Sequence, residues 1–199
     1  MRKRRRPKGS RPTQPSYLIV VQGQATELDY FKRLKSTFRI PGVNLVVEPH
    51  SPEKIVDKVR YNMANDKAAP YDRVCFVVDV DDSSPQQFQQ GFNKARKSTT
   101  GGTKCLFAVS NRCFEVWLLA HFADIRGREM EVGALTAGLR EHGALQAGSD
   151  KHLAADFPVE EYETASRNVS TANWNEIGPA PSTAVPKLVE ELIRAAEAS

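Results

Sequence analysis

The sequence predicts an α/β fold: a single domain with a mostly parallel, four-stranded sheet between helices. The chain has 199 residues, of which 40% are hydrophobic, and this is enough to bury one sizeable core. Four short apolar runs lack polar alternation, as is typical of strands covered on both faces, and helical patterns separate them. The alternating order implies right-handed crossovers between parallel strands. The expected strands are Tyr17–Val21, Val43–Val47, Val74–Val78 and Cys105–Val109.

The expected helices between these strands begin at polar capping residues. Thr26 precedes a run of helical periodicity and has Asp29 three residues on, close to a capping box. Ser-Pro pairs at 51–52 and 84–85 give a cap followed by proline at the first helical position. Asn111 is expected to cap the helix after the fourth strand. From Met130 onward the pattern is helical only. The expected helices after the fourth strand span residues 113–122, 132–142, 159–174 and 183–198.

We expect three parts in the chain: a basic arm (1–15), which its charge sets apart, then an α/β core (16–128) and a helical C-terminal part (129–199), which differ in their apolar patterns. The net charge is +4, but residues 1–11 hold seven bases and no acid, so the remainder carries −3. We expect the arm to be disordered alone, because it cannot bury apolar surface. One interpretation is that the arm binds phosphates through the bases Arg2, Lys3, Arg4, Arg5 and Arg6. The alternative is a solubilising tail or a cloning remnant.

Several classes of protein do not fit the sequence. No apolar stretch approaches the length of a membrane span, and no signal-peptide core follows the basic N-terminus, so we expect a cytoplasmic protein. Cys75, Cys105 and Cys113 have no metal-ligand spacing, and Cys75 and Cys105, which lie inside apolar runs, are expected to be core residues. The glycine-lysine phosphate loop of ATPases and the paired-histidine zinc motif are both missing.

Polar residues follow the first and third expected strands, where ligands bind in open α/β sheets. Gln22 and Glu27 follow the first strand, and Asp79 and Asp81 follow the third. In extended chain the two aspartates point the same way, and they repel each other unless a cation bridges them. Mg²⁺ or Mn²⁺ is the natural bridge, because both prefer oxygen ligands. The alternatives are a carboxylate at a helix start for Glu27 and an exposed acidic turn for the aspartates.

The apolar helix after the fourth strand carries two polar side chains. Glu115 lies on its first turn, where a charge needs a partner or a metal. His121 lies on the side of Trp117 and is interpreted as a structural histidine.

Four motifs resemble those of the RloB-like family. Residues 22–31 resemble its opening, in which a glutamate and a glycine precede Thr-Glu and Tyr-Phe. Residues 79–82 resemble its acidic strand end. Residues 110–119 resemble its Ser-Asn-Pro-Cys-Phe-Glu segment and are the most specific match, and 181–189 resemble its Pro-Ser-Thr tail. The resemblance covers roughly residues 17–195.

The resemblance implies a Toprim-like nuclease of anti-phage defence that cleaves RNA of the tRNA class or DNA. An ABC- or SMC-like ATPase is the expected partner, and homodimerisation stays open. In such a site the acids hold a metal that activates water and stabilises the departing oxygen, and a lysine neutralises developing charge. Asp79, Asp81 and Glu27 are then the metal ligands. The catalytic set is Gln22, Glu27, Asp79, Asp81, Glu115 and Lys151, and Lys187 joins the arm in binding nucleic acid.

The sequence departs from the family at Gln22, where the family has a glutamate. One explanation is a degenerate site in a subunit that binds or regulates. The other is a substitution that silences a toxic nuclease, which is favoured because the other acids remain.

Two further functions stay open. One is a catalytically inactive sensor or adaptor that binds nucleic acid or the ATPase. The other is a phosphotransfer or phosphatase domain for small molecules.

Overall fold

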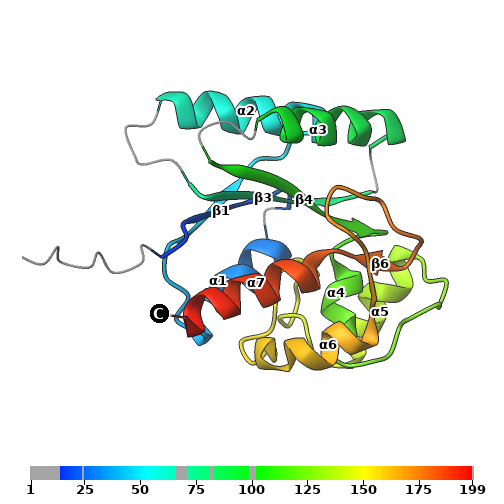
Figure 1. The fold of residues 1–199 in the computed structure, drawn as a ribbon. Helices are drawn as coiled ribbons and strands as arrows, with labels where there is room; N and C mark the ends of the chain where they lie inside the picture. Colours follow the sequence, from blue (N-terminus) through cyan, green and yellow to red (C-terminus); the bar gives the residue numbers. More distant parts are fainter. Residues whose placement is uncertain (1–13, 24, 66–70, 81–82, 99–101, 199) are drawn as a thin grey trace, which may run out of the picture.

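The computed structural model describes residues 14–23, 25–65, 71–80, 83–98 and 102–198. The predictions for the basic arm up to residue 13 and for Asp81 therefore lie outside the described residues. A six-stranded mixed sheet in the order β2-β1-β3-β4-β6-β5 crosses the middle of the molecule (Figure 1). Helices α2 (Pro52–Asn65) and α3 (Pro85–Lys97) cover one face, and the remaining helices lie on the other.

The four predicted strands are present and parallel to one another. They are β1 (Tyr17–Val21), β2 (Val43–Val47), β3 (Arg73–Asp79) and β4 (Lys104–Asn111). β1 pairs with β2 and β3, and β3 pairs with β4, all in parallel register. β3 and β4 are longer than predicted, because polar residues at their ends continue the ladder.

Two further strands show that the prediction of helices alone after Met130 was wrong. β5 (Ser170–Thr171) and β6 (Ser182–Thr183) have two residues each. β6 pairs antiparallel with β4, and β5 pairs parallel with β6, so the sheet has six strands rather than four. The buried hydroxyls of Ser110 and Thr183 lie 2.9 Å apart at this junction.

The helices on the second face begin and end close to their predicted bounds, with two corrections. The predicted helix over 159–174 stops at Asn168, because β5 follows, and the last helix starts at Val185, because β6 precedes it. The helices and the 3-10 turn on this face are α1 (Thr26–Thr37), α4 (Glu115–Ala120), α5 (Val132–Glu141), η1 (Val159–Glu161), α6 (Tyr162–Asn168) and α7 (Val185–Glu197).

One predicted cap is confirmed, and two were wrong. Ser84 forms a full capping box with Gln87 at the start of α3. The Thr26 cap was wrong: Ala25 occupies the cap position, and the Thr26 hydroxyl turns to its neighbour in the chain instead. The Asn111 cap was also wrong, because this residue ends β4 and its amide donates to the Gly178 carbonyl 2.8 Å away.

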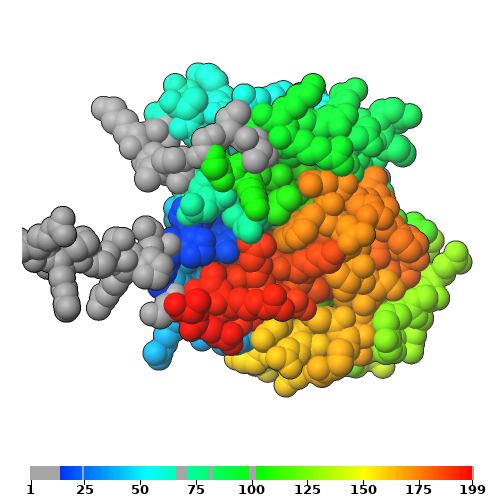
Figure 2. All heavy atoms as spheres, viewed as in Figure 1, coloured from blue at the N-terminus to red at the C-terminus, as the bar shows by residue number. Residues whose placement is uncertain are grey.

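The sheet separates two hydrophobic clusters. Alternate residues of β1 face opposite ways: Ile19 belongs to the cluster under α1, α4 and α7, and Val20 to the cluster under α2 and α3. The first cluster joins side chains from residues 17–125 with others from 135–193. Figure 2 shows the C-terminal segment, in orange and red, lying against the blue and green parts of the chain.

Cys75 and Cys105 are buried as free thiols, as predicted, and Cys113 is also a buried free thiol. None of the helices in the described part of the chain is long and apolar enough to cross a membrane.

Candidate functional site

The carboxyl ends of the parallel strands meet at one edge of the sheet, and a pocket of about 370 Å³ opens there. Gln22 follows β1, His50 follows β2, and Asp79 is the last residue of β3. The sequence prediction that the strand ends bring Gln22 and Asp79 together is therefore consistent with the geometry. The lining residues are Gln22, Gly23, Glu27, Pro49, His50, Ser51, Asp79 and Ser83.

A second pocket, of about 630 Å³, shares one wall with the first. Gly23 and Glu27 line both pockets, so the Glu27 carboxylate stands between them. The lining residues of the second pocket are Gly23, Ala25, Thr26, Glu27, Glu115, Asp150, Lys151 and His152. Of the residues predicted to be catalytic, Glu27, Glu115 and Lys151 thus come together at this pocket.

Glu27 is a nearly buried acid held by hydrogen bonds. Its side chain belongs to α1, and the residue is 6% exposed. Oε1 accepts from the Gly23 N–H at 3.1 Å, and Oε2 accepts from the Thr26 hydroxyl at 3.1 Å. Burial raises the pKa of Glu27, and the negative charge of Glu115 adds to this, while the hydrogen bonds oppose it. Glu27 therefore takes up a proton more readily than an exposed glutamate.

Gly23 is required by the close approach of this carboxylate. A Cβ atom at position 23 would lie 2.0 Å from Glu27 Oε2. No larger residue fits at position 23 while Glu27 keeps its place. The close approach of backbone and carboxylate at the site therefore depends on the glycine.

Gln22 connects the ends of three strands. Its Nε2 donates to the His50 carbonyl at 2.7 Å, and its Oε1 accepts from the Asp79 N–H at 3.1 Å. The backbone N–H of Gln22 donates to the Val77 carbonyl at 3.3 Å. His50 was not predicted as a site residue, although applying the strand-end rule to β2 would have indicated it.

Asp79 ends β3 beside Ser110 of β4. The next residue, Val80, donates its N–H to the carbonyls of Ser110 and Arg112, at 3.1 and 3.2 Å. The backbone of Asp79 is therefore hydrogen-bonded to the Gln22 side chain, and the backbone of the next residue, Val80, is hydrogen-bonded to the end of β4.

A loop of the C-terminal part closes the second pocket against α1. His152 Nδ1 donates to Asp29 Oδ2 at 2.9 Å, and the Leu153 N–H reaches the same oxygen at 3.4 Å. Lys151 is exposed next to this anchor. No local pattern predicts the His152–Asp29 contact, because 123 positions separate the two residues.

Lys187, predicted to bind nucleic acid, lies apart from the pockets. It belongs to the first turn of α7, and its Nζ donates to Asn173 Oδ1 at 2.7 Å. Lys187 is not one of the described residues that line the two pockets.

The donor set of the first pocket suits a hard cation. Glu27 and Asp79 supply carboxylate oxygens, which Mg²⁺ and Mn²⁺ prefer. In the part of the chain that the structure describes, no three or more His, Cys, Asp or Glu side chains are placed so that they could hold a metal ion together, and Asp81 lies outside this part. The described residues could thus provide part of a metal site.

The fold and the site define an α/β protein with acidic side chains at the carboxyl edge of a mixed sheet. The chain belongs to the RloB family: the model described as RloB-like protein matches residues 17–192. This range runs from the first residue of β1 into the last turns of α7 and confirms the resemblance seen in the motifs. Comparison with curated proteins gave no match, and comparison with solved structures gave none.

Proposed function

We propose that the protein is a metal-dependent nuclease of anti-phage defence, with a Toprim-like site at the carboxyl edge of its sheet. The observation that carries the proposal is that Glu27 and Asp79 line one pocket beyond the strand ends. Membership of the RloB-like family supports it, because the motifs that carry the resemblance include both acids. The substrate is RNA of the tRNA class or DNA.

The residues of the site have separate roles in this proposal. Asp79 and Glu27, with Asp81, would hold Mg²⁺ or Mn²⁺, which when bound would supply a Lewis acid beside a phosphate group. Lys151 would place a positive charge in the second pocket, where it offsets the charge that develops on phosphate. Glu115 lines the same pocket.

Binding of nucleic acid would extend beyond the pockets. The basic arm, with Arg2, Lys3, Arg4, Arg5 and Arg6, and Lys187 would contact phosphates at a distance from the reacting group. An ABC- or SMC-like ATPase partner would control the activity.

Cleavage and metal binding test the proposal separately. The chain is incubated with total tRNA and with plasmid DNA, in Mg²⁺, Mn²⁺ or EDTA, and Mn²⁺ binding is followed by electron paramagnetic resonance. We expect metal-dependent cleavage that falls about 100-fold or more in Asp79→Asn, together with weaker Mn²⁺ binding. Asp156→Asn, at an exposed position outside both pockets, is the matched control. Cleavage that survives both EDTA and Asp79→Asn would contradict the proposal.

The second candidate is a catalytically inactive subunit that binds nucleic acid or the ATPase as sensor or adaptor. Two observations favour it: Gln22 is neutral where the family has an acid, and burial favours the protonated form of Glu27. A defence assay in cells separates the two functions. Protection that persists in Asp79→Asn, with complex formation intact, would support the adaptor.

A further inference from the structure

The two hydrogen bonds of the Gln22 side chain fix the orientation of its carboxamide. The main-chain carbonyl of His50 can only accept a hydrogen bond, and the main-chain N–H of Asp79 can only donate one. The Gln22 nitrogen must therefore face His50, at 2.7 Å, and the oxygen must face Asp79, at 3.1 Å. A flipped amide would place donor against donor and acceptor against acceptor.

These contacts join three neighbouring strands through one side chain. β1 lies between β2 and β3 in the sheet, and Gln22 directly follows β1. Its side chain reaches the turn after β2 in one direction and the end of β3 in the other. The ladder of β1 with these two strands ends at Val21, so the Gln22 side chain continues the connection past the last paired residues.

A carboxylate at position 22 could satisfy only one of the two partners. An ionised glutamate accepts hydrogen bonds but donates none. One oxygen could accept from the Asp79 N–H, and the other would face the carbonyl oxygen of His50, where two acceptors repel each other. The turn at residues 48–51 would then lose its bond to the Gln22 side chain, although the Glu48 N–H would still donate to the Val21 carbonyl of β1, at 3.0 Å.

We infer that Gln22 is a positioning residue, whose neutral amide holds the backbone of Asp79 and the turn at His50 in place around the pocket. On this account the site requires a neutral amide at position 22, and Gln22 is not a substitution that inactivates a catalytic glutamate. This differs from the explanation that the sequence alone favours. The inference deepens the proposed function, since the main chain that Gln22 holds is the one that carries Asp79.

Amide hydrogen exchange measured by NMR on the full chain tests the two bonds one at a time. Gln22→Met keeps the length of the side chain and removes both bonds, so the Asp79 amide should exchange at least about tenfold faster. Gln22→Glu keeps an acceptor for the Asp79 N–H and loses the donor to His50. In this variant the Asp79 amide should stay protected, while the His50 amide, bonded to the Glu48 carbonyl at 2.8 Å, should exchange at least about fivefold faster.

Gln90→Glu on the exposed face of α3 is the matched control, because it adds the same charge outside both pockets. Its exchange rates at residues 50 and 79 should equal those of the unchanged protein. Unchanged exchange of the His50 amide in Gln22→Glu would overturn the inference, since the amide donor would then be dispensable.

Mn²⁺ binding gives a second readout that a purely structural role would not move. If Gln22 positions Asp79, Gln22→Met should bind Mn²⁺ at least about threefold more weakly than the unchanged protein. Gln22→Glu, which keeps the bond to the Asp79 N–H, should bind Mn²⁺ with an affinity within about threefold of that of the unchanged protein. A tenfold gain in affinity in Gln22→Glu would overturn the inference and indicate that a carboxylate belongs at this position. If the unchanged protein binds no Mn²⁺, the proposed metal site fails, and the exchange measurements alone decide the role of Gln22.

Discussion

The carboxyl edge and the aromatic cluster beneath it each hold a buried ionisable side chain, in opposite surroundings. Glu27 is 6% exposed, hydrogen-bonded through both oxygens, and lines two pockets. His121 is 5% exposed and surrounded by the rings of Tyr30, Trp117 and Phe157, with centroids 4.9–5.6 Å away. Burial shifts the pKa of both groups. Only the group that also reaches a pocket is placed for chemistry, so a shifted pKa alone does not mark a site.

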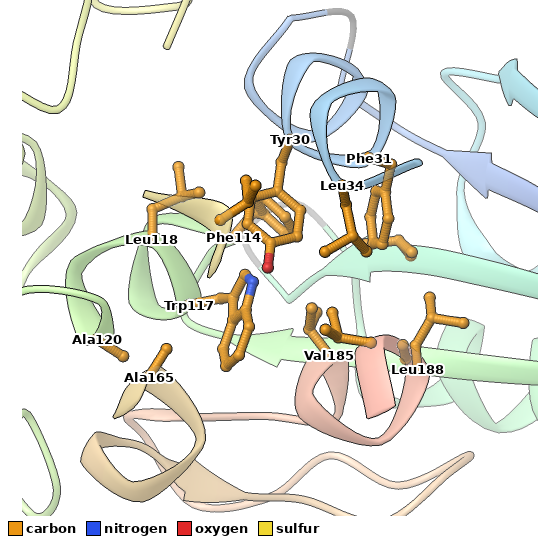
Figure 3. Close-up of a cluster of buried hydrophobic side chains, with 14 of the residues drawn as sticks. Tyr30, Phe31, Leu34, Phe114, Trp117, Leu118, Ala120, Ala165, Val185 and Leu188 are labelled. Carbon is orange, nitrogen blue, oxygen red and sulfur yellow. The ribbon is translucent and has the colours of Figure 1, made fainter. Parts of the chain in front are cut away.

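The two regions share the same helices. α1 carries Glu27 at the pockets and Tyr30 in the core, and α4 carries Glu115 at the pocket and Trp117 in the core. Figure 3 shows the Tyr30 hydroxyl directed at the indole nitrogen of Trp117, between these helices. The packing of the aromatic cluster therefore determines where the two glutamates of the second pocket stand.

The largest expected effect on stability is that of Trp117→Ala, which disrupts the aromatic cluster. Trp117 is fully buried, and its removal leaves a cavity between α1 and α4. We expect a loss of about 3–5 kcal/mol in the free energy of unfolding, measured by urea denaturation. The exposed Tyr61 provides the control, since Tyr61→Ala should change stability by no more than about 0.5 kcal/mol. A loss below about 1 kcal/mol in Trp117→Ala would show that the cluster is not what holds the helices.

The next effect is the acid sensitivity contributed by His121. Burial lowers the pKa of His121 from 6.5 to about 4, and its Nδ1–H donates to the Trp117 carbonyl at 3.0 Å. Between these two pH values the unfolded chain binds the proton and the folded protein does not, so stability falls as the pH drops. The loss is on the order of 3 kcal/mol over this range. We expect His121→Phe to remove this part of the pH dependence of chemical denaturation. His142→Phe, at an exposed position, is the comparison, and equal slopes in the two variants would refute the assignment.

The smallest effect has the opposite sign and arises at Glu27. Because the pKa of Glu27 is raised in the folded state, the folded protein holds a proton there that the unfolded chain releases more readily. This contribution to the free energy of unfolding is complete below the usual carboxyl pKa and is lost as the pH rises through the raised pKa. Hydrogen bonds from Gly23 and Thr26 to the carboxylate oppose the shift and keep this loss small. Glu27→Gln removes the titrating group, so melting temperatures should vary less between pH 4.5 and 8 than in the unchanged protein. Glu160→Gln, on the surface, controls for the change in charge, and a matching change there would count against Glu27.

The sequence predicts the parts of the fold that rest on local pattern. The four buried parallel strands have apolar runs, and α7 has a clear apolar stripe, so both could be found. β5 and β6 could not, because two Ser-Thr pairs have no apolar pattern and become strands only by pairing at the edge of β4. Asn111 looks like a cap for the same reason: nothing local shows that β4 continues through it.

The candidate site divides in the same way. Gln22 and Asp79 follow buried strands, and Glu115 interrupts an apolar helix, so each has a local signal. The turn at His50 also follows a strand, β2, but it has no pair of charged residues that would indicate a site. The contact between His152 and Asp29 depends on folding of the C-terminal part onto α1, which no local pattern encodes.

The pairing of β6 with β4 also constrains how the protein is made. β4 emerges from the ribosome about 70 residues before the segment that completes its edge, and α7, which contributes side chains to one hydrophobic cluster, follows that segment. The nascent α/β part therefore exposes an unpaired strand edge and an uncovered sheet face until β6 and α7 have been made. For a protein proposed to cut nucleic acid, this order of events delays completion of the second pocket until the loop with Lys151 has been made, and completion of the sheet until β6 has been made.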